Sequence, residues 1–276
     1  MRFFVAVGVA LFAFAGNSLL TRAALADGSA NADAFAAIRL VSGAAMLAAI
    51  GLVPGIGVIP ALRDVPTVLA LFAYAAAFSR AYLSLGAATG ALVLFASVQF
   101  TMVAGGMLRG ARFTGVQLGG LAMALGGLGW MLAPGLAPPP LGGFLLMVAA
   151  GVAGGVYSTV GRDLGEPVAR TARNFIGTVP LAVLLLMLAG SWGSPRQILL
   201  AVISGTVTSA LGYVVWYSVL PRLSGIAAAS LQLSVPVIAA VGSVLWLREP
   251  LSVTLVGATL LILAGIGLTL PRGKGK

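Results

Sequence analysis

The stretch "SALGYVVWYSVLPRLSG" (209–225) decides the fold, because the chain carries a weaker copy of it 135 residues earlier. The copy is "AAAFSRAYLSLGAATG" (75–90), and it places Tyr82 where the later stretch has Tyr217. Both copies lie in long apolar tracts, yet they carry phenol and indole groups that hydrocarbon surroundings do not require. Self-similarity at a fixed spacing indicates that the chain consists of two related halves.

The repeat continues on both sides of these stretches in the same order. Downstream, "FASVQFT" (95–101) aligns with "SLQLSVP" (230–236) at the same spacing. Upstream, "FAGNSLLTR" (14–22) aligns with "GGVYSTVGR" (154–162) at a spacing of 140. Small changes in loop length explain the difference in spacing. The further matched pairs are Phe78 with Tyr213, Ser97 with Gln232, Gln99 with Ser234, Asn17 with Tyr157, Ser18 with Ser158, Arg22 with Arg162, and Arg39 with Arg173.

The composition is that of a membrane protein. Hydrophobic residues make up 60% of the 276 residues, charged residues only 8%, and the mean hydropathy is +1.09. A soluble domain carries roughly 25% charged residues. The apolar tracts also exceed the roughly 20 residues that a helix needs to cross the hydrocarbon core. The sequence therefore predicts an all-α polytopic membrane protein. Its ten expected spans are 3–22, 33–53, 65–85, 90–108, 114–132, 142–161, 168–189, 197–219, 224–247 and 251–270.

The repeat assigns five spans to each half, with residues 1–135 as the first half and 136–276 as the second. An odd number of spans makes the second half enter the membrane in the opposite orientation. Carriers with such inverted repeats bind their substrate near the middle of the membrane, where the halves meet. The proline-rich "APGLAPPPLG" (133–142) is the expected linker. We expect the first apolar segment to be retained rather than cleaved as a signal peptide, because its removal would break the repeat.

The basic residues predict the orientation. With the N-terminus inside, the inner segments carry eleven of the sixteen Lys and Arg residues and the outer segments carry five. This bias satisfies the positive-inside rule and predicts that both termini are cytoplasmic. The arginines are dispersed at helix ends, so the net charge of +10 predicts no nucleic-acid partner. The inner set is Arg2, Arg63, Arg109, Arg112, Arg162, Arg170, Arg173, Arg222, Arg272, Lys274 and Lys276, and the outer set is Arg22, Arg39, Arg80, Arg196 and Arg248.

At this point the chain resembles the EamA-type members of the drug/metabolite transporter superfamily. The resemblance rests on the five-plus-five spans, on "GNSLLTR" (16–22) ending the first span, and on the arginine of "AAIRLVSG" (36–43) in the second. It covers the whole chain, and within the superfamily it is greatest to the YddG-type exporters of aromatic and other neutral amino acids. The resemblance implies a ten-helix inner-membrane carrier with a central cavity.

Aromatic side chains inside the repeated spans are candidates for lining that cavity. Tyr74, Phe78 and Tyr82 recur every fourth residue, so they share one face of a helix. The later span repeats the pattern with Tyr213 and Tyr217. Amphipathic aromatic side chains either form belts at the membrane interface or line a site, and both interpretations stay open. Trp216 completes the aromatic set, as the neighbour of Tyr213 three residues on.

Amides inside the spans are the second group of candidates. An unpaired amide in hydrocarbon costs several kcal/mol, so Asn17, Gln99 and Gln232 require a protein partner, water or a substrate. Packing between helices is the alternative to a substrate site. The repeat brings Gln99 and Gln232 to equivalent helices, and Tyr157 joins the set because it matches Asn17. These residues complete the predicted substrate site.

Three arginines are candidates for gating or for contact with a carboxylate. Arg80 is the most deeply placed charge of its span, and snorkelling to the interface is the alternative to a role at the outer mouth. Arg39 and Arg173 match across the repeat, which suits a structural or gating role, and anchoring at helix ends is the alternative. No other charged residue is assigned to the site.

The absent residue types narrow the function further. The chain has no Cys and no His, so disulfides and Cys/His metal sites are excluded, and we expect no cofactor. All six acids fall in loops or at span ends, whereas proton and sodium relays use carboxylates inside spans. We therefore predict a facilitative carrier that acts as a monomer on a small molecule, with amino acids as the leading class. The alternatives are export of nucleosides or cationic drugs, a membrane-embedded enzyme, and a lipid-handling or scaffolding protein.

Overall fold

The computed structural model describes residues 2–26, 30–51, 57–110, 114–132, 138–160, 166–223 and 231–269, and these residues form helices and connecting turns without a strand. Seven of the described helices are long and apolar enough to cross a membrane. The first half contains α1 (Arg2–Leu25), α2 (Ala32–Ile50), α3 (Val65–Ala81), α4 (Ala87–Leu108) and α5 (Gly115–Met131), with a 3-10 turn η1 (Leu62–Asp64) before α3.

The second half contains the helices that follow the predicted linker. Among the described residues the two halves form ten helical units, if the consecutive segments between Pro195 and Arg222 count as one, and these units fall on the ten predicted spans. The all-α polytopic class is thereby confirmed. The units are α6 (Leu141–Val160), α7 (Pro167–Leu188), the run of α8 (Pro195–Ile203), η3 (Ser204–Leu211), α9 (Gly212–Val219) and η4 (Leu220–Arg222), then α11 (Ser234–Leu245) and α12 (Val253–Thr269).

The surface of the described helices is apolar, as a lipid-facing surface must be. Large hydrophobic side chains such as Phe4, Phe12, Leu184 and Leu260 are exposed. Soluble monomers rarely expose such surfaces over large areas, because burying them away from water is favourable. The exposed side chains and the span lengths together support the membrane assignment.

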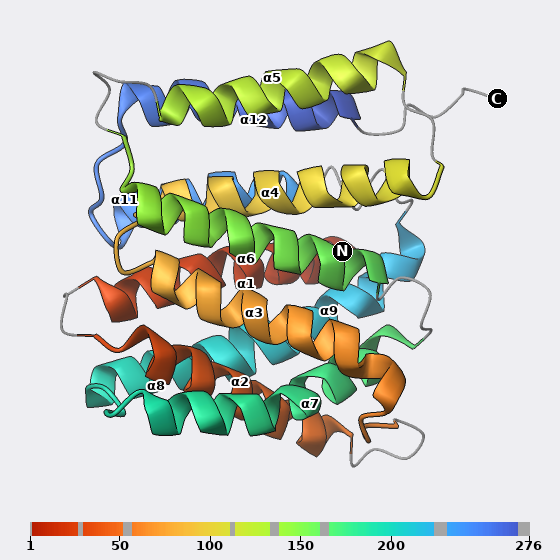
Figure 1. Ribbon diagram of the computed structural model, residues 1–276, viewed down its shortest axis with the longest axis vertical. Helices are drawn as coiled ribbons and strands as arrows, with labels where there is room; N and C mark the ends of the chain where they lie inside the picture. The colour runs from red at the N-terminus through yellow and green to blue at the C-terminus, as the bar shows by residue number, and fades with distance from the viewer. Residues whose placement is uncertain are drawn as a thin grey trace.

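The helices pair between the halves in a regular way. Along the long axis of Figure 1, α5 and α12 lie together at one end, α4 and α11 follow, and α2, α7 and α8 form the opposite end. In addition, α3 and α4 both pack on α6, while α9 and α11 both pack on α1. The repeat makes α1 equivalent to α6, α3 to α9 and α4 to α11. Exchanging the two halves therefore converts the α3–α6 contact into the α9–α1 contact and leaves the α4–α11 contact unchanged. This pattern is the one expected of an inverted repeat, which stays a prediction.

The eighth span departs from the regular helix that its hydropathy predicts. Its middle, η3, is a π-helix, a wider turn that is found mostly at functional sites. Gly205 in this segment packs against α2 so closely that a Cβ atom would meet the carbonyl oxygen of Arg39. The hydroxyls of Ser204, Thr208 and Ser209 all point to α1 from this segment, and they bind the same asparagine there.

Two prolines fall inside predicted spans, where proline is expected to interrupt a helix, and they differ in their placement. Pro180 lies inside α7, where proline removes a backbone hydrogen bond. Pro236 lies instead in the first turn of α11, where the missing N–H would have no intrahelical partner in any case. In the described part of the ninth span the helix is thus interrupted at Leu233, because residues 231 and 232 are helical, Leu233 is a turn and α11 begins at Ser234. Its first seven predicted residues, 224–230, lie outside the described residues.

Candidate functional site

A cavity of about 420 Å³ lies among α1, α3, α4, α6, α7 and α9. Pockets that bind small molecules range from roughly 300 to 1,000 Å³, so this cavity has the size of a site for a small metabolite. Its walls come from both halves of the chain. Nine of the ten residues predicted for the substrate site line it: Asn17, Tyr74, Phe78, Gln99, Tyr157, Tyr213, Trp216, Tyr217 and Gln232.

Tyr82 is the predicted site residue that does not line the cavity. Its side chain is fully buried behind Phe78, with the two ring centroids 4.8 Å apart and the rings edge-to-face. It also fills the space beside Gly90, where any larger side chain would collide with the tyrosine ring. The spacing of four residues places Tyr82 on the same helix face as Phe78. The end of α3 at Ala81 turns it toward the start of α4.

Two aromatic stripes form much of the wall. On α3, Tyr74 and Phe78 lie with ring centroids 5.3 Å apart. On α9, Tyr213 and Tyr217 stack with centroids 5.8 Å apart. Phe14 of α1 joins the second stripe, since its ring lies 5.5 Å from that of Tyr213, and it also contacts the ring of Trp216. Such walls bind flat or apolar groups by stacking and apolar contact.

The amide of Asn17 is held by the π-helical segment of the eighth span. Its Oδ1 accepts hydrogen bonds from Ser204 at 3.0 Å, Thr208 at 2.6 Å and Ser209 at 3.2 Å. Its Nδ2 donates to the carbonyl oxygen of Thr208. Asn17 therefore joins α1 to η3, as the helix-packing alternative requires, although its side chain also borders the cavity.

The amides of Gln99 and Gln232 are in a different situation. Both side chains line the cavity and are partly exposed to it, and neither forms a hydrogen bond within the part of the chain that the structure describes. An amide at this depth requires a polar partner. These two residues are thus available to water or to a ligand in the cavity.

Arg39 lies behind the aromatic wall rather than in the cavity lining. Its guanidinium carbon is 5.0 Å from the ring centroid of Phe78 and 5.5 Å from that of Tyr74. Its Nε donates to Ser209 at 3.3 Å, and its Nη2 donates to the hydroxyl of Tyr74 at 3.4 Å. Since the side chain is only 3% exposed, Arg39 supports the wall by cation–π and hydrogen-bond contacts.

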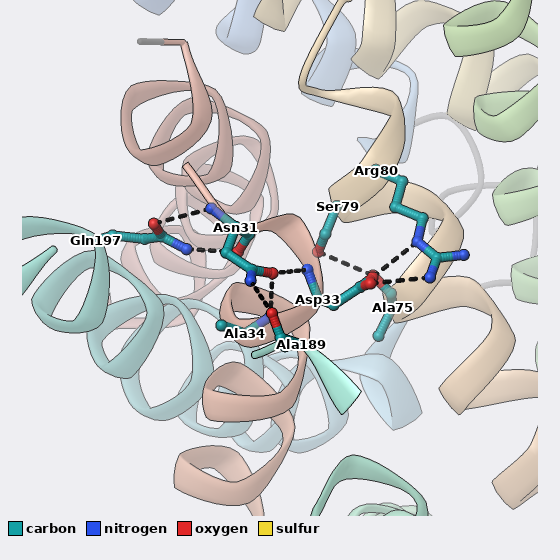
Figure 2. A network of polar contacts seen from close by, with 8 residues as sticks. All are labelled: Asn31, Asp33, Ala34, Ala75, Ser79, Arg80, Ala189 and Gln197. Carbon is teal, nitrogen blue, oxygen red and sulfur yellow. Dashed lines mark hydrogen bonds and ion pairs between the residues drawn. The ribbon is translucent and has the colours of Figure 1, made fainter. Parts of the chain in front are cut away.

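Arg80 was a candidate for contact with a substrate carboxylate, and the structure gives it a carboxylate of the protein instead. Figure 2 shows its bidentate pair with Asp33, at 2.7 Å from Nε and 2.9 Å from Nη2. Close by, Asn31 caps α2 and its Nδ2 donates to the carbonyl oxygen of Ala189 at 2.8 Å. The side chain of Gln197 bonds the backbone of Asn31 in both directions. These contacts join α2 to α3, α7 and α8.

A second ion pair lies at the same end of the helices. Nε of Arg22 donates to Glu249 at 2.8 Å, and the other oxygen of Glu249 accepts from the backbone N–H of Ala87 at 2.7 Å. Arg22 also donates to the carbonyl oxygen of Tyr82 at 3.0 Å. We call this end, with its Arg22, Asn31, Asp33, Arg80, Gln197 and Glu249, the network end. Its contacts tie the ends of α1, α3 and α4 to the segment after α11.

The opposite end carries Arg173 and the exposed part of the cavity lining. Arg173 pairs with Asp64 at 3.1 Å, and next to it Thr67 donates to Asn174 at 2.9 Å. Arg173 thus holds α7 against the start of α3 and does not reach the cavity. Ser158, at the end of α6, is the exposed member of the lining. The cavity lining therefore extends to this end, where its exposed member lies, and we call it the open end.

Sequence reasoning missed two features of the lining. Phe14 has no aromatic counterpart in the repeat, so its spacing carries no signal. Arg170 was counted only as an orientation signal, although its side chain lines the cavity and is 8% exposed. Its position three residues before Arg173 could have indicated two buried arginines on one helix. The sequence could not show that one faces an aspartate and the other faces the cavity.

Comparisons with known proteins place these features in a family. An uncharacterised protein of Pseudomonas aeruginosa, PA1977, is 48% identical over 272 residues, which cover 97% of this chain and 94% of that protein. A solved crystal structure shares the fold with a TM-score of 0.68 at 21% sequence identity, covering 97% of this chain and 96% of that chain. Residues 141–270 match the EamA-like transporter family. The chain therefore belongs to one family with the Pseudomonas protein and carries an EamA-like transporter domain in its second half.

Proposed function

We propose that this protein is a secondary carrier that exports small amphipathic metabolites across the inner membrane. Aromatic and other neutral amino acids are the leading substrate class. The observation that carries the proposal is the cavity between the two halves, with its aromatic walls and its two amides that lack protein partners within the described residues. Stacking on the rings would hold an apolar side chain, and the amides would bind polar groups without a fixed charge.

The two ends of the molecule support transport by alternating access. At the network end, ion pairs and amide contacts join helices of both halves, while the exposed lining residue Ser158 lies at the open end. With cytoplasmic termini, which the excess of inner arginines predicts, the open end faces the cytoplasm. The carrier would then load substrate from the cytoplasm and release it after the network end separates. The inverted repeat is the expected basis of this exchange.

The cavity supports a facilitative mechanism. No acidic side chain lines it in the part of the chain that the structure describes. Coupling to protons or sodium commonly uses a carboxylate inside a span, where burial makes its ionisation depend on the ion. We infer that the solute runs down its own gradient and that the protein works as a monomer.

Counterflow into proteoliposomes tests the carrier proposal directly. Vesicles loaded with unlabelled phenylalanine should accumulate labelled phenylalanine without an imposed proton or sodium gradient. A panel of other amino acids, nucleosides and cationic drugs separates the leading substrate class from the alternatives. Counterflow with nucleosides or cationic drugs alone would replace amino acids as the substrate, and no counterflow with any compound would refute the carrier function.

A further inference from the structure

Three arginine side chains among the described residues are more than nine-tenths buried, and they differ in what neutralises them. Arg173 has the carboxylate of Asp64 at 3.1 Å. Within the described residues Arg39 has no carboxylate partner and its Nη1 has no hydrogen bond, but its guanidinium lies over two aromatic rings and donates to two hydroxyl groups. For Arg170, Nε has no hydrogen-bond partner, and no carboxylate of the described residues forms an ion pair with its guanidinium. Its charge is therefore uncompensated by the described protein.

The position of Arg170 directs this charge to the cavity. It is the fourth residue of α7 and lies near Ser158, toward the open end. A buried cation without an anion is costly, because it loses its hydration and gains no Coulomb attraction in return. Water in the cavity reduces that cost, and an anionic ligand removes it. The cavity wall thus has a preformed preference for negative charge at Arg170.

Much of the remaining cavity lining is aromatic. Tyr74, Phe78, Tyr213 and Trp216 contribute rings, and the described lining adds neutral amides but no carboxylate. A ligand that fits both the rings and the guanidinium has an apolar or aromatic body and a carboxylate. An ammonium group on such a ligand would find no acidic partner among the described lining residues.

We propose that the cavity selects small amphipathic carboxylates and that Arg170 binds their carboxylate group. This inference rests on the proposed carrier function for its biological meaning. A guanidinium donates two parallel hydrogen bonds to a carboxylate, which provides both affinity and orientation. The amino group of an amino acid is then dispensable for binding, whereas the carboxylate is required. Cationic compounds are poor ligands of this site.

A binding assay on the purified protein tests the inference without relying on transport. Trp216 lies in the cavity, and the other three tryptophans, Trp130, Trp192 and Trp246, lie outside its lining and have exposed side chains. Replacing those three by Phe leaves one fluorescent reporter in the site. The probes are 3-phenylpropanoate, phenylalanine, 3-phenylpropanamide and 2-phenylethylamine. We expect the two carboxylates to bind on the order of 10- to 100-fold more tightly than the amide and the amine, as charge-assisted hydrogen bonds require.

Variants at Arg170 test whether this side chain makes the distinction. Arg170→Gln should abolish the preference for 3-phenylpropanoate over its amide, and Arg170→Lys should keep part of it because the charge remains but the paired donors do not. Arg63→Gln is the matched control, since Arg63 is an exposed arginine of η1 near the open end. It removes the same charge and should leave all four affinities unchanged. If Arg170→Gln does not fold, the probe series still shows whether the cavity prefers carboxylates, and Arg170→Lys still shows whether Arg170 causes that preference.

Each outcome separates this inference from the carrier proposal. Equal affinity for 3-phenylpropanoate and its amide, tighter binding of the amine, or no binding of any probe would overturn the role of Arg170. An unchanged preference in Arg170→Gln would overturn it as well. If the carboxylate preference holds but neither 3-phenylpropanoate nor phenylalanine nor any other compound of the panel shows counterflow, the site stands and the carrier function fails.

Discussion

Replacing Glu249 by Gln should open the network end and shift the protein toward a state in which the cavity is accessible from that side. The carboxylate of Glu249 accepts from Arg22 at 2.8 Å and from the N–H of Ala87, at the start of α4, at 2.7 Å. Both side chains of the ion pair are about one-fifth exposed, at 21% for Arg22 and 18% for Glu249. Exposed ion pairs contribute little, whereas partly buried hydrogen bonds to charged groups contribute about 1.5–3 kcal/mol.

A glutamine keeps one acceptor oxygen and loses the charge. We therefore expect Glu249→Gln to destabilise the closed network end by about 2 kcal/mol. This corresponds to a roughly 30-fold shift in the equilibrium between the closed and open states of that end. This shift applies if the ion pair exists only while the network end is closed. Acceleration of cavity labelling from the network side by that factor is the expected result.

The assay uses a single cysteine in this cysteine-free chain. Ser18 lines the cavity and is 1% exposed, so Ser18→Cys reports access to the site. Intact cells or right-side-out vesicles are treated with a membrane-impermeant maleimide, and the labelling rate is compared with and without Glu249→Gln. Glu166→Gln is the matched control, because Glu166 is an exposed acid outside the network end.

A second reporter separates opening from unfolding. Ala124 on α5 is fully buried and lies outside the cavity, so Ala124→Cys should stay unlabelled in both backgrounds. If the labelling rate of the Ser18→Cys reporter changes less than twofold while the protein stays folded, the ion pair does not hold the closed end. Equal acceleration at both reporter positions would show that the substitution only loosens the fold.

Three further predictions follow from the cavity, from helix packing and from the orientation. Gln99→Leu should keep thermal stability in detergent while transport per folded molecule falls at least tenfold; intact transport would remove Gln99 from the site. Gly265→Val should lower the melting temperature, because a Cβ there would lie 2.5 Å from the carbonyl oxygen of Gly120 and such overpacking costs roughly 1–3 kcal/mol of stability. An unchanged melting temperature would show that α5 and α12 can separate at little cost. Single cysteines introduced by Gly55→Cys and Ala137→Cys should react with impermeant maleimide from opposite sides of the membrane, and reaction from the same side would contradict the span assignment.

The sequence predicts the membrane class and the span positions because both depend on local composition. A helix in hydrocarbon satisfies its own backbone, so an apolar tract of sufficient length is almost enough to specify it. The aromatic stripes of α3 and α9 are local as well, since the repeat carries them in register. Tyr82 marks the limit of that reasoning. Periodicity gives the face of a helix, and only the chain turn after Ala81 determines that this ring packs toward Gly90 rather than into the cavity.

Contacts between distant segments could not be predicted in the same way. Asn17 carries no mark in the sequence that distinguishes it from Gln99, yet its Oδ1 accepts hydrogen bonds from the hydroxyls of Ser204, Thr208 and Ser209. Those hydroxyls reach it because η3 is a π-helix pressed against α2 at Gly205, and neither the hydropathy nor the repeat indicates that turn. Whether an amide serves packing or a ligand is thus decided by segments nearly two hundred residues away.

The sequence positions of the acidic residues do not reveal their roles, because those roles depend on the residues they contact. Their absence from span interiors predicts that no buried carboxylate carries ions, but it does not say what the acids at the ends do. Of the four acids within the described residues, three bind arginines of other helical segments: Asp33 with Arg80, Asp64 with Arg173 and Glu249 with Arg22. The fourth, Glu166, is exposed. Acid–arginine pairs thus join helices at both ends of the molecule, and the buried guanidinium of Arg170 has no such protein partner among these acids. A ligand carboxylate would give Arg170 the contact that Asp64 gives to Arg173. The same guanidinium chemistry can therefore stabilise the fold at Arg173 and select a substrate at Arg170, one helical turn away.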